Sequence, residues 1–185
     1  MIRATHSWAP ASALACVLAL AACAPDIRFA PPPQKTLPQG VERPIVHPSI
    51  DMSDLRSEGF IIQDVLTLDG PSEFAWTNHR PRFQVWLDDG ASRVFRMRIG
   101  VPEETFTSTG PVTVSVLVNG QRIAAPRFDQ PGMHDYECPV AEALLAEHSP
   151  AIVGLDIQPV FLDPRTHKEL GVLLYLIGLP QAHIP

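Results

Sequence analysis

The stretch PVTVSVLVNGQRI, Pro111 to Ile123, decides the fold of this 185-residue chain. Its four valines alternate with Thr113, Ser115 and Leu117, and a period of two is typical of a β-strand with one buried face. Asn119-Gly120 follows between two apolar runs. Because both central residues of a type I′ turn need a positive φ, this dipeptide is the strongest short-range signal for a hairpin. The segment therefore predicts an antiparallel strand pair with the valines in the core.

Short apolar alternations of the same kind recur along the chain, separated by turn residues about every eight to twelve positions. This spacing predicts an all-β fold, an antiparallel β-sandwich. Strand parity places Phe83 and Val85 in the core, and Phe74 and Trp76 are expected to join them. One segment departs from the strand pattern. VAEALLAEH, residues 140–148, has apolar spacing that predicts a single short helix.

Three stretches carry a resemblance to a known fold: FAWTNHRPRFQVWL, VPEETFTSTGPVTVSVLVNGQRI and RFDQPGMHDYECPV. Together they resemble a β-sandwich domain of bacterial envelope and glycan-associated proteins, similar in outline to galactose-binding-like jelly rolls. In that pattern, a strand pair around a VNG turn precedes a PG-x-x-x-Y-x-x-PV segment. The matching residues are Pro131, Gly132, Tyr136, Pro139 and Val140. The resemblance implies a jelly-roll-like sandwich whose relatives often bind carbohydrate, but it transfers no site.

The first residues form a secretory signal pattern, in which Arg3 precedes an apolar run and small residues lead to Cys23. Leu20-Ala21-Ala22-Cys23 resembles the lipobox of bacterial lipoproteins. The resemblance implies a signal peptide over residues 1–22, acylation of Cys23, and a chain anchored in the membrane of the cell envelope. Ala24 stands where an aspartate tends to retain lipoproteins in the inner membrane, so the outer membrane is favoured. The alternative is an ordinary cleaved signal with a chance cysteine.

A proline-rich tract follows the predicted anchor, and residues 24–48 hold seven of the 20 prolines. Proline lacks the backbone donor that helices and central strands need. We therefore expect residues 23–58 to be the lipidated cysteine and an extended linker, and residues 59–185 to be the sandwich domain.

Composition and motifs exclude several functions. The net charge of -6 argues against nucleic acid as a partner. With Cys16 in the signal and Cys23 lipidated, only Cys138 is left, so no intrachain disulfide is expected. The histidines have no metal-ligand spacing, and no hydrolase, zinc or phosphate-loop motif occurs. The sequence predicts neither an enzyme nor a cofactor or metal site.

One patch is a candidate binding face. It comprises Arg82, Gln84, Trp86, Arg96 and Arg98. These side chains would share the outward face of two adjacent strands if the DDGAS turn joins those strands in a hairpin. An indole ring stacks on a sugar ring, and Arg and Gln donate hydrogen bonds to its hydroxyls. The alternative is that Trp86 is covered by the linker, the helix or the other sheet, which would move the search to the loops at residues 78–80 and 129–134.

Two functions are compatible with these features. The anchor, the linker and the missing catalytic motifs favour a lipid-anchored, non-catalytic envelope lipoprotein that acts in protein interaction or assembly. The alternative is a carbohydrate-binding module that recognises envelope glycan through the face around Trp86.

Overall fold

The computed structural model describes residues 46–66, 72–88, 92–145 and 150–182. The predicted signal peptide and Cys23 lie outside these residues. Within them the chain is almost entirely antiparallel β-structure, in one sheet of ten strands and a small two-stranded sheet. The predicted all-β antiparallel class is confirmed.

The hairpin predicted at Asn119-Gly120 is present. It joins β5 (Val112–Val118) to β6 (Gln121–Ala124), which pair antiparallel. Asn119 has a φ of 48° and Gly120 a φ of 81°, as a type I′ turn requires. After β6 the chain continues along the same edge of β5 as β7 (Arg127–Phe128).

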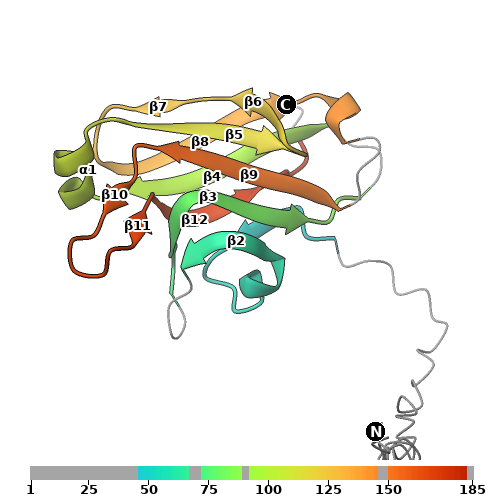
Figure 1. Ribbon diagram of the computed structural model, residues 1–185. Helices are drawn as coiled ribbons and strands as arrows, with labels where there is room; N and C mark the ends of the chain where they lie inside the picture. Colours follow the sequence, from blue (N-terminus) through green and yellow to red (C-terminus); the bar gives the residue numbers. More distant parts are fainter. Residues whose placement is uncertain (1–45, 67–71, 89–91, 146–149, 183–185) are drawn as a thin grey trace, which may run out of the picture. The chain divides into compact units, whose positions relative to one another are not determined.

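The ten-stranded sheet curls into two layers that share one long strand, β3 (Ala75–Val85) (Figure 1). The first layer contains, in order, β2 (Ile61–Leu66), β3, β9 (Ala151–Gln158), β5, and then β6 and β7 along one edge. The second layer contains, in order, β3, β12 (Leu173–Gly178), β4 (Arg93–Val101) and β8 (Gly132–Val140). The end of β3 pairs with β9 and its beginning pairs with β12, so β3 forms the corner of the sandwich.

A short strand outside the expected domain also joins the second layer. This is β1 (Ser49–Asp51), which pairs with β12. A single 3-10 turn, η1 (Ser57–Phe60), then leads into β2. The sheet therefore includes a piece of the segment that the proline content had indicated as linker.

The core lies between the two layers and follows the predicted parity. The four valines of β5 are at most 3% exposed, and Phe83 and Val85 of β3 are fully buried. From the second layer, Phe95, Met97 and Ile99 of β4 meet Leu174 and Ile177 of β12, all with no exposed surface. Each of these side chains stabilises the fold by about 1.5 to 3 kcal/mol through burial.

The predicted core positions of Phe74 and Trp76 are wrong. Both side chains are half-buried, whereas their neighbours Ala75 and Thr77 face the core. The buried residues of β3 are all odd-numbered, from Ala75 and Thr77 at its start to Val85 at its end, so they share the parity of Phe83. The Thr77 hydroxyl avoids a burial penalty because it donates to the carbonyl of Val172 and accepts from the amide of that residue, both at 3.0 Å.

The one α-helix among the described residues lies elsewhere than predicted. It is α1 (Glu103–Thr109), whose polar and β-branched residues give no helical periodicity. Of the predicted helix over residues 140–148, the described part contains only a 3-10 turn, η2 (Glu142–Leu144), and residues 146–148 lie outside the described range. In α1, the hydroxyl of Thr107 donates a hydrogen bond to the carbonyl of Glu103, one turn earlier in the helix. The hydroxyl of Ser108 donates to the carbonyl of Glu104 in the same way.

A hairpin of β10 (Phe161–Leu162) and β11 (Glu169–Leu170) projects at the same end of the sandwich as α1 (Figure 1). No helix among the described residues has the length and apolar character needed to cross a bilayer.

Candidate functional site

The five residues of the predicted binding face do not form one surface. Strand β12 lies between β3 and β4, so the two strands are not adjacent, and the predicted hairpin between them is wrong. The chain leaves β3 in the first layer and enters β4 in the second. Arg82 and Gln84 consequently face out from the first layer, and Arg96 and Arg98 face out from the second.

The side chain of Arg82 is held in place by hydrogen bonds to the neighbouring strand β9. Its guanidinium donates to the carbonyl of Leu155 and to Asp156, both at 2.6 Å. The side chain lies directly over Gly154, where an added Cβ would come within 2.6 Å of the Arg82 Cδ. A side chain at position 154 would displace that of Arg82, and the guanidinium, already bonded to two partners, has little capacity left for a ligand.

Arg96 and Arg98 are paired across the second layer. Arg96 contacts Glu137 of β8 at 2.5 Å and Arg98 contacts Asp135 at 2.7 Å. The hydrogen bond from Arg98 holds the pKa of the Asp135 carboxyl below its usual value. These are exposed cross-strand ion pairs, whose contribution to stability is screened by solvent.

Trp86 is half-buried and lies just beyond β3. Its backbone forms a two-way bridge with His47, through N–O distances of 3.0 and 3.2 Å. The end of the proline-rich tract therefore runs beside the backbone of Trp86.

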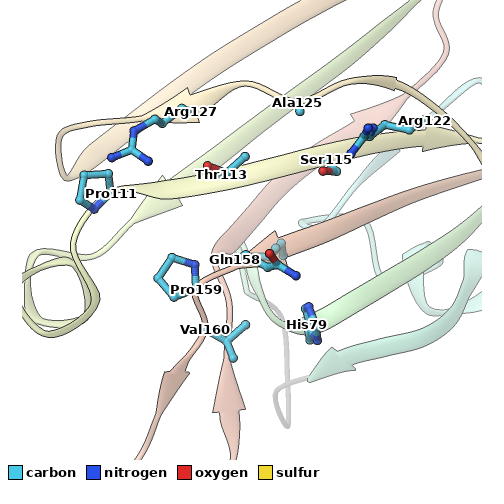
Figure 2. Close-up of a pocket in the computed structure, with 11 residues that line it drawn as sticks. His79, Pro111, Thr113, Ser115, Arg122, Ala125, Arg127, Gln158, Pro159 and Val160 are labelled. Carbon is cyan, nitrogen blue, oxygen red and sulfur yellow. The ribbon is translucent and has the colours of Figure 1, made fainter.

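The first layer carries an open groove that the sequence did not single out. It has a volume of about 780 Å³ and runs over the outward side of β5 and β9. Its polar lining residues are His79, Thr113, Ser115, Arg122, Arg127 and Gln158. The apolar lining residues are Pro111, Ala125, Ile157, Pro159 and Val160. Figure 2 shows these side chains projecting from neighbouring strands into one space.

Sheet register places the groove residues side by side. Thr113 of β5 is opposite Gln158 of β9 on one flank and opposite Arg127 of β7 on the other. Two residues further along β5, Ser115 is opposite Asp156 of β9. The next outward residue of β5, Leu117, is opposite Arg122 of β6. His79 of β3 closes the far side (Figure 2). Five strands thus contribute polar groups to one face: β3, β9, β5, β6 and β7.

The groove differs from the other polar surfaces in how its side chains are bonded. Among the residues that the structure describes, the side chains of Thr113, Ser115, Arg122 and Gln158 make no hydrogen bond or ion pair. Arg127 alone is paired, with Asp129 at 2.8 Å. Hydroxyls and amides both donate and accept, and a guanidinium offers five donors. The groove therefore presents a set of hydrogen-bonding groups to whatever enters it.

Part of the groove was visible in the sequence. The alternation around β5 correctly predicts that Thr113 and Ser115 face outward. The segment 78–80, which contains His79, was expected to be a strand-end loop, but it lies inside β3. Gln158 and Arg122 carry no signal of their own, because their place depends on which strands flank β5. Periodicity gives the face of a strand but not its neighbours.

No group of three or more His, Cys, Asp or Glu residues suited to a metal ion occurs in the described ranges. Cys138 of β8 is half-buried beside Tyr136, and burial raises the pKa of its thiol.

Comparison with known proteins adds the following. No family model and no curated protein matches the sequence. Among solved structures, the chain is similar to a family 35 carbohydrate-binding module from an environmental isolate, with 13% identity over 74% of this chain and 98% of that module, at a TM-score of 0.44.

Two enzymes contain a similar region. One is a family GH115 4-O-methyl-α-glucuronidase with specificity for decorated arabinogalactans, matched at 10% identity over 73% of this chain and 17% of the enzyme, with a TM-score of 0.46. The other is an exo-β-1,3-galactanase from Phanerochaete chrysosporium, matched at 13% identity over 71% of this chain and 29% of the enzyme, with a TM-score of 0.39. Likeness at these sequence identities and TM-scores concerns the fold alone and indicates no ligand.

Proposed function

We propose that this chain is a glycan-binding module and that the groove across β5 and β9 is its binding site. The observation that carries the proposal is the row of unpaired donors and acceptors on Thr113, Ser115, Gln158 and Arg122. A sugar chain presents hydroxyls along its length, and each needs a partner when it leaves water. A groove open along a flat sheet accommodates such a chain.

The apolar part of the lining fits the same ligand. Pro111, Pro159 and Val160 offer compact surfaces against which the C–H faces of a sugar ring can pack. The volume of about 780 Å³ lies within the range of about 300 to 1,000 Å³ that is usual for ligand sites. The core of a protein interface is typically enriched in Tyr, Trp and Phe, and the described lining of this groove contains none of them, which favours the carbohydrate alternative over protein docking at this face.

Binding without hydrolysis is the role that the lining supports. Most glycoside hydrolases place two carboxylates about the bond they cleave. The described lining of the groove contains hydroxyls, amides and guanidinium groups instead.

The proposal is tested by applying the full chain to an array of neutral, acidic and amino-sugar oligosaccharides. We expect it to bind a restricted set of oligosaccharides of three or more units, because the groove spans several strands. Isothermal titration of the strongest ligands then gives the affinity. If the chain binds no oligosaccharide, or binds only monosaccharides with an affinity unaffected by chain length, the groove is not a glycan site.

We further propose that Cys23 is acylated and tethers the module to the bacterial cell envelope, at the outer membrane. Support comes from the Leu20-Ala21-Ala22-Cys23 box and from Ala24 after it. Two or more acyl chains anchor a protein stably, at about 0.8 kcal/mol for each buried methylene.

Replacing Cys23 with serine is expected to abolish both acylation and membrane association, because the serine has no thiol to carry the lipid. Incorporation of an azido-palmitate and fractionation after a carbonate wash measure the two effects. Ala22→Ser, which keeps the thiol, is the control. A serine variant at Cys23 that still sediments with membranes refutes the anchor.

A further inference from the structure

A second, smaller groove lies on the outward side of the second layer, away from the groove over β5 and β9. Its volume is about 350 Å³, and its lining includes Glu103, Met133, Leu173 and Tyr175 around Gly100. The character of this lining is apolar and aromatic with one carboxylate, unlike the hydroxyl and amide lining over β5 and β9. We call it the Tyr175 groove.

Sheet register explains why a depression forms here. Gly100 of β4 is opposite Met133 of β8 on one side and opposite Leu173 of β12 on the other. A Cβ at Gly100 would come within 3.3 Å of Cε2 of Tyr175. The tyrosine ring therefore lies over the glycine, and the absence of a side chain leaves a notch between Met133 and Leu173.

The aromatic wall is held in place from behind. The ring of Tyr175 packs against Phe74, with centroids 5.5 Å apart and planes tilted by 49°. No hydrogen bond to the Tyr175 hydroxyl occurs among the described residues. Across the notch, Met133 is 54% exposed although it is a large apolar side chain. Exposed, pre-positioned Tyr and Met side chains are typical of protein-binding surfaces.

One carboxylate at the rim of the groove, that of Glu103, indicates the charge of the molecule that binds there. Glu103 is exposed and has no ion pair with any described residue. The two acidic residues of the adjoining strand β8, Asp135 and Glu137, are already paired with arginines. A free carboxylate beside an aromatic ring favours a cation, through both charge and the ring quadrupole. The net charge of the chain, -6, favours a basic partner as well.

From these observations we infer that the Tyr175 groove docks a segment of a partner protein that presents an arginine or lysine between apolar side chains. The cation meets Glu103 and the face of Tyr175, while the apolar neighbours cover Met133 and Leu173. This inference is independent of the glycan proposal, because the two grooves share no residue.

The test is a selection of displayed random twelve-residue peptides against the full chain. Recovered peptides are expected to share a basic residue flanked by apolar residues. Synthetic copies of these peptides are then titrated against variants. Glu103→Gln and Met133→Ala should each weaken binding about tenfold. Both side chains are exposed at the surface, so thermal melts of the two variants should match the wild type.

Two matched controls exist in the chain. Glu104→Gln removes the neighbouring carboxylate, which does not line the groove, and Leu162→Ala removes another exposed apolar side chain, on β10. Neither should change peptide affinity by more than about twofold.

Several outcomes overturn the inference. They are selection of acidic or purely apolar peptides, no enrichment at all, or equal effects of Glu103→Gln and Glu104→Gln. Self-association that Met133→Ala abolishes would assign the groove to a second copy of the chain. Oligosaccharide binding that Glu103→Gln weakens would assign it to a sugar. Because Thr113 and Gln158 are untouched in these variants, failure here leaves the glycan result unchanged.

Discussion

Replacing Arg93 with methionine should lower the free energy of unfolding by about 3 kcal/mol, because it removes a buried guanidinium that donates hydrogen bonds to the exposed Asp88 carboxylate and to two backbone carbonyls. The Arg93 side chain is 2% exposed and forms an ion pair with Asp88. Its guanidinium also donates to the carbonyl of Asp88 at 2.8 Å and to that of Leu179 at 3.3 Å. It therefore links the end of the first layer to the segment after β12.

The measurement is thermal and urea unfolding followed by circular dichroism. For a domain of this size, 3 kcal/mol corresponds to a fall in Tm of about 10 °C. Arg96→Met on the same strand is the control, because Arg96 is 46% exposed and its pair with Glu137 should contribute less than about 1 kcal/mol. Equal effects of the two substitutions would contradict the role given to Arg93.

The contribution of this pair should also depend on pH. The hydrogen bond from Arg93 holds the pKa of Asp88 below its usual value. A carboxyl with a lower pKa in the folded than in the unfolded state stabilises the fold above the unfolded pKa, about 4, and loses this effect as the pH falls through the folded value. The difference between wild type and Arg93→Met should therefore narrow below about pH 4.

Removing three polar groups from the groove should weaken glycan binding about a hundredfold. The variant combines Thr113→Val, Ser115→Ala and Gln158→Ala. Each lost hydrogen bond costs about 1 kcal/mol, and 1.4 kcal/mol is a factor of ten in affinity. The side chains make no bonds within the described chain, so the fold should keep its Tm within about 2 °C.

A matched triple variant separates the groove from a general surface effect. Gln84→Ala, Thr107→Val and Ser108→Ala remove the same chemical groups at positions outside the groove. This variant should bind the oligosaccharides identified on the array with wild-type affinity. If the two triple variants behave alike, the hydrogen-bonding row on β5 and β9 does not determine recognition.

Local signals in the sequence predicted much of the fold. The Asn119-Gly120 turn needs only its own backbone conformation, and it appears as predicted. The valines of β5 and Phe83 with Val85 are buried because alternation along one strand is a local property. The run from Leu170 to Leu179 is apolar on both faces, which is typical of a central strand, and β12 lies between β3 and β4.

The same strand explains why the predicted binding face failed. Placing Arg82 beside Arg96 assumed that consecutive strands pair. Instead β12, from the end of the chain, inserts between them, and the two arginines face away from different layers. Likewise, Gln158 lies beside Thr113 only because β9 pairs with β5. Long-range pairing of this kind leaves no mark in the period of a single strand.

The central claim is that the groove over β5 and β9 holds a glycan. The most direct test is the amide spectrum of the isotope-labelled full chain, titrated with the oligosaccharide that binds most tightly on the array. We predict saturable chemical-shift changes centred on Thr113, Ser115, Gln158 and Arg122, with the amides around Met133 and Tyr175 unaffected. Shifts centred on the second layer, or no saturable shift with any oligosaccharide of the array, would contradict the claim.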